Sequence, residues 1–170
     1  MTIMRIKRLG LFALPFVRRI FTGRITPMLA GYKITHRCNL KCVHCPYWKR
    51  EGDELDFQGV KRTLATLRST GAVILIIEGG EPMLWRDGRY GISDVIEEAH
   101  KLFACVCMTT NGLIGFEGLN LNRVWVSLDG PERIHDSVRG AGVYSRVISN
   151  LKKVPGSRGF VSFTISAMNY

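Results

Sequence analysis

The apolar positions along this chain fall into short continuous runs and longer stretches with helical spacing. Residues 73–78 (Val-Ile-Leu-Ile-Ile-Glu) form the clearest run, of the kind found in strands buried on both faces of a parallel sheet. Four further strands are predicted at residues 32–35, 104–109, 123–127 and 160–166. Helical periodicity appears between them at residues 56–69, 92–103 and 144–153. Strands that alternate with helices predict right-handed βαβ crossovers, and hence an α/β fold with a parallel sheet.

Short polar or glycine-rich motifs directly follow four of the predicted strands. A cysteine cluster follows the first strand, and Gly79-Gly80-Glu81-Pro82 follows the second. Thr110-Asn111-Gly112 follows the third, and Ser127-Leu128-Asp129-Gly130 closes the fourth. The carboxyl ends of parallel strands meet at one edge of the sheet, where α/β proteins bind their ligands. We therefore expect these motifs to form one site.

The cysteine cluster consists of Cys38, Cys42 and Cys45, in the spacing C-x3-C-x2-C. A structural zinc site normally collects four Cys or His ligands, and an ordinary iron–sulfur cluster collects four cysteines. Three thiolates leave one position for a substrate or cofactor, although zinc binding stays an alternative. Cys105 and Cys107 lie in an apolar run, where free cysteine behaves as a small hydrophobe, so we expect them in the core.

The positive charge is concentrated at one end of the chain. The formal net charge is +10 over 170 residues, yet the first 50 residues hold eleven Lys and Arg and no acid. The remainder is almost neutral, which disfavours nucleic acid as a partner of the whole domain. We divide the chain into a basic, apolar leader at residues 1–29 and a core domain at residues 30–170. An odd number of cysteines without a convincing export signal predicts a cytoplasmic protein.

The leader has two competing interpretations. Residues 1–26 carry basic residues and apolar residues at helical spacing, which favours peripheral contact with an anionic membrane. Leu11 and Leu14 fall on the supposed polar face and Pro15 interrupts the middle, which favours a helix that packs on the domain. Contact with nucleic acid is a third alternative.

The cysteine motif and Gly79-Gly80-Glu81-Pro82, in this order, resemble the signatures of the radical S-adenosylmethionine (radical SAM) superfamily. The run Ser127-Leu128-Asp129-Gly130-Pro131, followed by His135-Asp136 and Arg139-Gly140, resembles the branch with the molybdopterin-biosynthesis cyclase and peptide-maturing enzymes. The resemblance covers residues 30–168. It implies a partial (βα)6 TIM-like barrel whose last βα unit is absent from this chain. It also implies a [4Fe–4S] cluster that cleaves S-adenosylmethionine reductively to a 5′-deoxyadenosyl radical, which abstracts a hydrogen from the substrate.

The resemblance also assigns roles to residues. Cys38, Cys42 and Cys45 are the expected cluster ligands, and S-adenosylmethionine chelates the fourth iron. The remaining expected cofactor residues are Gly79, Gly80, Glu81, Pro82, Asn111, Ser127, Asp129 and Arg139. The alternatives are ordinary turns at the glycines and at Asp129-Gly130, a hairpin at Asn111-Gly112, and a surface ion pair for Arg139. No catalytic acid or base is identified.

The expected partners follow from this chemistry. The substrate is unidentified and is expected to be a peptide, a lipid or a small molecule, with an electron donor such as flavodoxin or ferredoxin. The alternative function is a non-catalytic zinc or iron–sulfur module that contacts nucleic acid through the basic leader.

Overall fold

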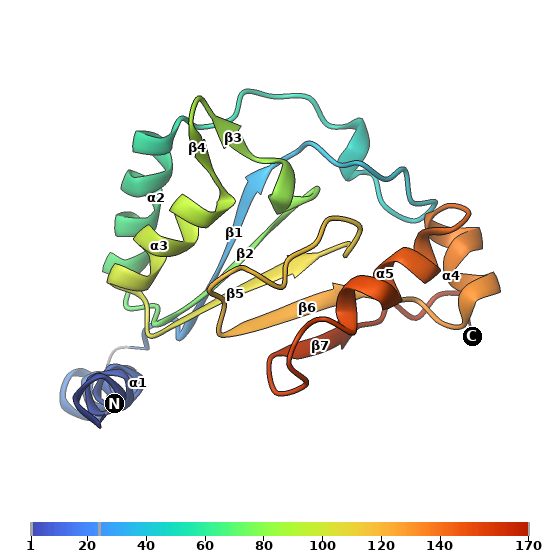
Figure 1. The fold of residues 1–170 in the computed structure, drawn as a ribbon. Helices are drawn as coiled ribbons and strands as arrows, with labels where there is room; N and C mark the ends of the chain where they lie inside the picture. Colours follow the sequence, from blue (N-terminus) through green and yellow to red (C-terminus); the bar gives the residue numbers. More distant parts are fainter. Residues whose placement is uncertain (1, 24, 170) are drawn as a thin grey trace.

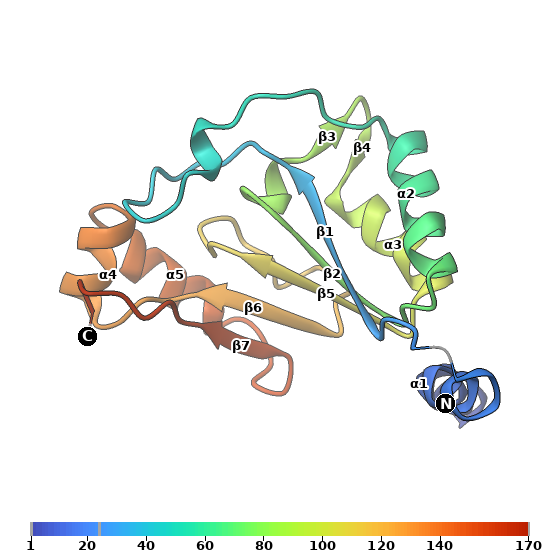
Figure 2. The same cartoon turned by 180° about the vertical axis from the view of Figure 1, so that it is seen from behind.

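Five parallel strands form the centre of the molecule. The fold comes from a computed structural model that describes residues 2–23 and 25–169, and the side chains of these residues other than 2–9, 11 and 14. The sheet order is β1-β2-β5-β6-β7. Figures 1 and 2 show a curved sheet that does not close into a barrel. The bounds are β1 (Leu29–Thr35), β2 (Ile74–Gly79), β5 (Cys105–Thr110), β6 (Arg123–Ser127) and β7 (Gly159–Ser162).

Two helices cover the first half of the sheet and two accompany the second half. α2 (Phe57–Ser69) and α3 (Ile92–Leu102) pack together over β1, β2 and β5, and α4 (Glu132–Arg139) and α5 (Val143–Leu151) lie beside β6 (Figure 1). The Asp56 side chain caps α2 by accepting a 2.6 Å hydrogen bond from the Gly59 N–H, which satisfies a donor that the helix leaves free. The α/β prediction with a parallel sheet is confirmed.

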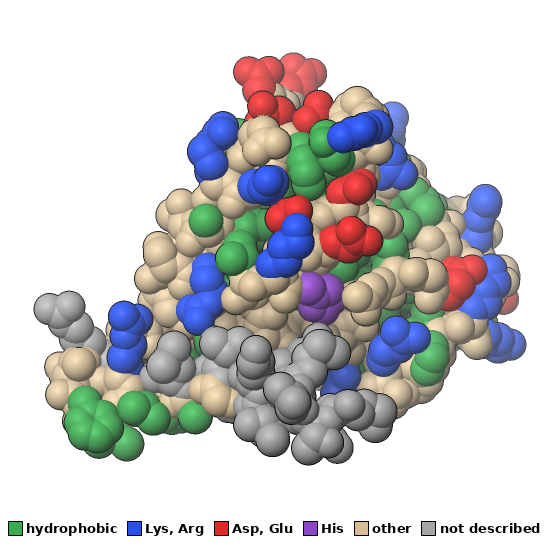
Figure 3. Space-filling view, turned by 60° about the vertical axis from the view of Figure 1, so that its left-hand side comes forward, with side chains coloured by type: hydrophobic (Ala, Val, Ile, Leu, Met, Phe, Trp, Pro, Cys, Tyr) green, Lys and Arg blue, Asp and Glu red, His purple; other side chains and the backbone are tan. Residues whose placement is uncertain are grey.

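The leader forms helix α1 (Thr2–Thr22), which continues through Pro15. Figures 1 and 2 place it near the amino-terminal ends of β1 and β2, apart from the other helices. The side chains of Leu11 and Leu14, on which one interpretation of the leader depends, lie outside the described residues. Figure 3 shows apolar side chains gathered on the described part of α1, whereas the outer surface of α2 and α3 mixes both signs of charge. None of the described helices is both long and apolar enough to cross a membrane.

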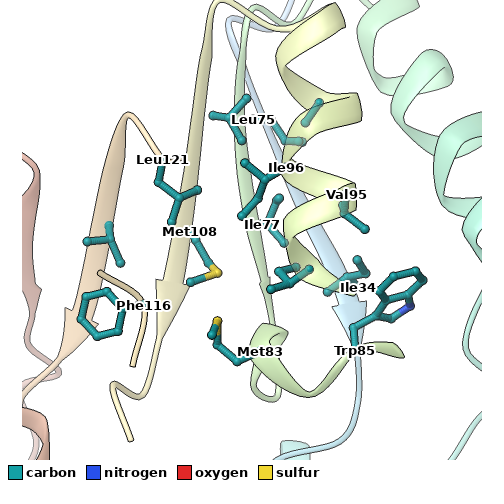
Figure 4. Packing of buried hydrophobic residues seen from close by; sticks show 14 of the residues in the cluster. Ile34, Leu75, Ile77, Met83, Trp85, Val95, Ile96, Met108, Phe116 and Leu121 are labelled. Atoms are coloured by element: carbon teal, nitrogen blue, oxygen red, sulfur yellow. The ribbon is translucent and has the colours of Figure 1, made fainter. Parts of the chain in front are cut away.

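The main core lies between the sheet and helices α2 and α3 (Figure 4). Leu75, Ile77 and Met108 from the strands meet Val95 and Ile96 of α3, and all five side chains are fully buried. The prediction that residues 73–78 are buried on both faces is wrong. Their alternate side chains stay partly exposed, because the helices cover only one face of the sheet.

The last strand and the last helices differ from the predictions. β7 ends at Ser162 instead of residue 166, because the Thr164 N–H turns away to donate to Asp129 Oδ1 at 3.2 Å. Asn169 Nδ2 also donates to Thr164 O at 2.7 Å, which keeps this segment out of the ladder. Helix α4 was not predicted, since it is short and mostly polar.

Two short elements complete the fold. The hairpin β3 (Arg86–Asp87) and β4 (Tyr90–Gly91) and the two 3-10 turns, η1 (Tyr47–Lys49) and η2 (Pro82–Leu84), were also not predicted. The hairpin considered at Asn111-Gly112 is absent, because β5 and β6 run parallel. Residues 111–122 connect these strands as a loop without a helix.

Candidate functional site

The cysteine loop leaves the end of β1 and is fastened to the glycine-rich motif after β2. The Gly80 N–H donates to Thr35 O at 2.9 Å, and the Glu81 N–H donates to Arg37 O at 2.8 Å. A Cβ atom on Gly79 would lie 2.4 Å from Thr35 O, and one on Gly80 would lie 2.3 Å from Arg37 O. Real Cβ atoms do not approach that closely, so both positions require glycine in order to seat the cysteine loop. The sequence had suggested a different reason for glycine at these positions, namely that the backbone approaches a ligand closely.

Glu81 joins the second motif to the third. Its side chain is fully buried and accepts hydrogen bonds from Thr110 Oγ1 at 2.9 Å, the Asn111 N–H at 2.8 Å and the Met83 N–H at 3.1 Å. Burial raises the pKa of this carboxyl, and these three donors oppose the rise. The carboxylate therefore fixes the ends of β2 and β5 relative to each other.

Asn111 connects β5 to the cysteine loop. Its Nδ2 atom donates to Asn39 Oδ1 at 2.7 Å and lies 3.9 Å from Cys38 Sγ, while its Oδ1 atom accepts from the Leu113 N–H at 3.0 Å. Asn39 was not predicted as a site residue. Its position inside the cysteine motif is the feature of the sequence that could have identified it as a site residue.

A buried ion pair lies on the opposite side of the cysteine loop, between the end of β6 and helix α4. Arg139 Nε donates to Asp129 Oδ2 at 2.7 Å, with side-chain exposures of 9% and 1%. The pair is not on the surface. Burial by itself would raise the pKa of Asp129, but the Arg139 guanidinium keeps that pKa below its usual value. Arg139 Nη1 also lies 3.9 Å from Cys42 Sγ, so the pair brings a positive charge to one of the three thiols of the cysteine loop.

His135 supports this pair from the first turn of α4. Its Nδ1 atom accepts a 3.1 Å hydrogen bond from the Asp129 N–H, so the proton of the neutral ring lies on Nε2. The ring is fully buried, and its Nε2 atom has no partner among the described residues. His135 thus fixes the loop between β6 and α4.

The motifs surround a cavity of about 160 Å³. Seven of the residues expected from the sequence line it, namely Cys38, Cys45, Gly79, Gly80, Asn111, Ser127 and Arg139. The other four expected residues do not line the cavity and are buried, namely Cys42, Glu81, Pro82 and Asp129. His44 lines the cavity as well, and so do Glu78, Thr109 and Thr110, three residues which the sequence did not suggest as ligand-binding residues. The four strand ends thus converge, as their position after parallel strands led us to expect.

The three thiols suit a multinuclear centre. No group of three or more His, Cys, Asp or Glu side chains in the described part of the chain converges on one ion. A [4Fe–4S] cluster needs no such convergence, because each thiolate binds a separate iron atom. Burial raises the pKa of Cys38 and of Cys42, and the Arg139 guanidinium opposes the rise at Cys42. A cationic metal centre would stabilise the thiolates further.

Comparison with known proteins gives a consistent result. A family model described as the Radical SAM superfamily matches residues 32–168. Pre-heme d1 synthase from Dinoroseobacter shibae is 30% identical over 168 residues, which cover 91% of this chain and 40% of that protein. The antilisterial bacteriocin subtilosin biosynthesis protein AlbA from Bacillus subtilis is 29% identical over 153 residues, covering 82% and 33%.

A solved structure shares the fold. The structure of native anSMEcpe with bound AdoMet and Cp18Cys peptide has a TM-score of 0.61 at 20% identity, with 81% of this chain and 42% of that chain covered. The chain therefore spans less than half the length of each of these three proteins.

Proposed function

The chain belongs to the radical SAM superfamily, and we propose that it forms the part of a radical SAM enzyme that binds a [4Fe–4S] cluster and S-adenosylmethionine. Cys38, Cys42 and Cys45 would hold three irons. When bound, the cluster and S-adenosylmethionine supply a 5′-deoxyadenosyl radical that abstracts hydrogen from a substrate. The observation that carries this proposal is the convergence of the four strand-end motifs on one cavity beside the cysteine loop.

The residues around the cavity divide into binding and positioning groups. The Ser127 hydroxyl and the Arg139 guanidinium line the cavity and supply donors suited to a carboxylate. The backbone carbonyls beside Gly79 and Gly80 supply acceptors for an ammonium group. Asp129 already accepts hydrogen bonds from Arg139 and from the Thr164 N–H. Its role in this proposal is therefore to orient Arg139.

The names of the relatives indicate a broad class of substrate. One relative is named as a synthase of a heme precursor and another as a bacteriocin biosynthesis protein, and the anSMEcpe structure contains a bound peptide. These names support a peptide or a small molecule as the substrate.

Anaerobic reconstitution with iron and sulfide tests the proposal. We expect a brown protein that forms 5′-deoxyadenosine from S-adenosylmethionine when dithionite is added, and a Cys42→Ala variant that does neither. If the protein instead binds zinc stoichiometrically, shows no charge-transfer absorption and does not cleave S-adenosylmethionine, the result favours a non-catalytic metal-binding module.

We further propose a cytoplasmic protein that attaches to membranes through α1. Phe16, Ile20 and Phe21 are 58%, 78% and 83% exposed on this helix, next to the exposed Arg18 and Arg19. Exposed apolar side chains beside arginines suit the interface of an anionic bilayer. The odd number of cysteines, five in the chain, supports a reducing compartment.

Flotation with vesicles of phosphatidylglycerol or of phosphatidylcholine tests this attachment. We expect binding to the anionic vesicles only, weakened at least about 30-fold by Arg18→Glu with Arg19→Glu, since each basic residue contributes about 1 kcal/mol near such a surface. The exposed residues Arg146 and Lys152, changed to Glu together, give the matched control. Equal binding of all three proteins would contradict the attachment.

A further inference from the structure

A row of partly exposed side chains crosses the face of the sheet that the helices leave open. The strand register places one residue of each of the five strands in this open-face row, namely Lys33, Glu78, Thr109, Trp125 and Phe160. Ile77 and Met108, the preceding residues of two of these strands, pack against α3 and are fully buried (Figure 4). Because side chains alternate between the two faces of a strand, the open-face row lies on the opposite face.

The open-face row continues directly from the cavity described above. Glu78 and Thr109 belong to the row and also line the cavity. Ser127, which follows Trp125 by two residues on the same strand, lines the cavity as well. A molecule that lies on the open-face row is therefore adjacent to the cavity in which the proposed function places S-adenosylmethionine.

The end of the open-face row at β6 and β7 is aromatic. The centres of the Trp125 and Phe160 rings lie 5.7 Å apart, with an angle of 29° between the ring planes. Phe160 is 43% exposed and Trp125 is partly exposed, so this pair presents aromatic surface outside the core. Such surface stacks favourably with other flat rings.

An uncompensated cation lies beside the aromatic pair. The Arg123 guanidinium lies 5.9 Å from the centre of the Phe160 ring. Arg123 is exposed and forms no ion pair with any carboxylate in the described part of the chain. At the other end of the row Lys33 pairs with Glu78 at 3.2 Å. The free guanidinium therefore suits a carboxylate of a ligand, which it can bind through two parallel hydrogen bonds.

The width of the open-face row indicates the size of the ligand. Neighbouring strands lie about 4.8 Å apart, so the three intervals from Glu78 to Phe160 span about 14 Å along the sheet. A single aromatic ring covers only part of this width. A flat system of several linked rings covers it from the aromatic pair to the residues that line the cavity.

We propose that the open-face row and Arg123 bind the substrate, and that the substrate is a flat conjugated system of several rings that carries carboxylate groups. This proposal rests on the proposed function, which supplies the radical in the adjacent cavity. The rings would stack on Trp125 and Phe160, and a carboxylate would pair with Arg123. An extended peptide is disfavoured, because it adds to unpaired strand edges, whereas β2, β5 and β6 are paired on both sides.

Titration with coproporphyrin III, a soluble flat ring system with carboxylate side chains, tests the proposal, with the shift of its main absorption band as the readout. We expect saturable binding to the iron-loaded chain. Trp125→Leu and Arg123→Glu should each raise the Kd at least about tenfold, because one removes a stacking partner and the other reverses a charge-assisted hydrogen bond. The partly exposed Trp48, changed to Leu, and the exposed Arg62, changed to Glu, are the matched controls and should leave the Kd unchanged.

A porphyrin with N-methylpyridinium groups in place of the carboxylates separates the contribution of charge from that of stacking. We expect it to bind the unmodified chain more weakly than coproporphyrin III does. Arg123→Glu should strengthen its binding, whereas Trp125→Leu should weaken it. Equal effects of Arg123→Glu on both porphyrins would contradict the pairing of Arg123 with a carboxylate.

The outcomes separate the possible failures. An unchanged Kd in the Arg123→Glu and Trp125→Leu variants, or equal losses in the controls, overturns the binding site. Arg123→Glu changes an exposed side chain, so it tests the site even if the Trp125 variant fails to fold in urea denaturation. Release of coproporphyrin III as the chain concentration rises would show that a second copy covers the open-face row, and would overturn the proposal.

The proposed function and the substrate class fail in different ways. A chain that forms 5′-deoxyadenosine but binds coproporphyrin III no better than the Trp125→Leu variant does overturns the substrate class alone. Tighter binding of a cysteine-containing peptide, also lost in the Trp125 variant, overturns the substrate class as well. A chain that takes up no iron overturns the proposed function, and with it the assignment of the bound ring system as a substrate.

Discussion

Single residues at the ends of the strands determine where the cysteine loop lies relative to the sheet. Gly80 allows the loop backbone to approach, Glu81 satisfies the donors at the end of β5, and Asn111 reaches across to Asn39. Each contact joins motifs that are far apart in the sequence. Substitutions at these positions should therefore disturb the proposed metal site without removing any of its three cysteines.

Gly80→Ala tests this dependence. The new Cβ atom would lie 2.3 Å from Arg37 O, so the loop must move, at a cost of about 1–3 kcal/mol typical of overpacking. We expect a lower free energy of unfolding in urea and reduced iron uptake. Gly118→Ala is the control, since a Cβ atom there meets nothing within 4 Å. Similar losses in both variants would show that the close approach at Gly80 is not the cause.

The two groups of cysteines should respond differently to substitution. Cys42→Ala should abolish cluster assembly, whereas Cys105→Ala should leave the iron content unchanged and cost about 1 kcal/mol of stability. Cys105 lies on β5, where its sulfur is 3.5 Å from that of Cys107. Iron analysis after reconstitution, together with urea denaturation, measures both effects. Loss of iron in the Cys105 variant would contradict its structural role.

The sequence predicted which motifs would meet at one cavity, because these motifs directly follow parallel strands. The sequence could not predict contacts between segments that meet only in the folded chain. Nothing in the local pattern near Gly80 or Asn39 shows which backbone or side chain will face these residues. Burial of the Arg139–Asp129 pair was also not predictable, since an Arg near the end of a short polar helix usually faces water.

Helix α4 is the element that couples the end of β6 to the cysteine loop. The Val43 N–H donates to Val138 O at 3.0 Å, and Arg139 follows directly with its contacts to Asp129 and Cys42. His135 anchors the other end of the helix. The long, strongly periodic helices were predicted from their apolar faces, but α4 was missed because only His135 and Val138 are buried in it.

The stability of this element should depend on pH through His135. Burial, with the Arg139 charge nearby, lowers the pKa of His135 below its usual value of 6.5. Below about pH 6.5 the unfolded chain therefore binds a proton that the folded chain does not, and the free energy of unfolding falls by at most about 1.4 kcal/mol per pH unit. His135→Asn keeps an acceptor for the Asp129 N–H but does not titrate.

Urea denaturation of the apo-protein between pH 5.5 and 7.5 measures this effect. We expect a smaller loss of stability toward acid in the His135→Asn variant than in the unmodified chain. Protonation of other groups is common to both proteins and cancels in the comparison. Identical pH dependence in the two proteins would show that His135 does not titrate as its surroundings indicate.

At the scale of the whole molecule, the five parallel strands form an open sheet and not a closed barrel. β1 and β7 are the edges of the sheet, and among the described residues β7 pairs with β6 alone. The alternation of strands and helices predicted the parallel sheet, but it could not predict the curvature or the open concave face, which depend on how neighbouring strands pack. The consequence is an exposed edge with apolar residues: Phe160, Val161 and Phe163 are 43%, 49% and 47% exposed.

An open apolar edge offers unpaired backbone groups to a second chain. We therefore expect this 170-residue chain to self-associate with rising concentration, and Val161→Lys to reduce the association, because a charge on an edge strand opposes pairing between chains. Sedimentation velocity over a range of concentrations measures both proteins, and Ser145→Lys on the exposed surface of α5 controls for added charge. If the unmodified chain stays monomeric throughout, or if both variants dissociate equally, the edge is not the contact. Association that only Val161→Lys weakens would identify β7 as the strand through which the sheet is extended.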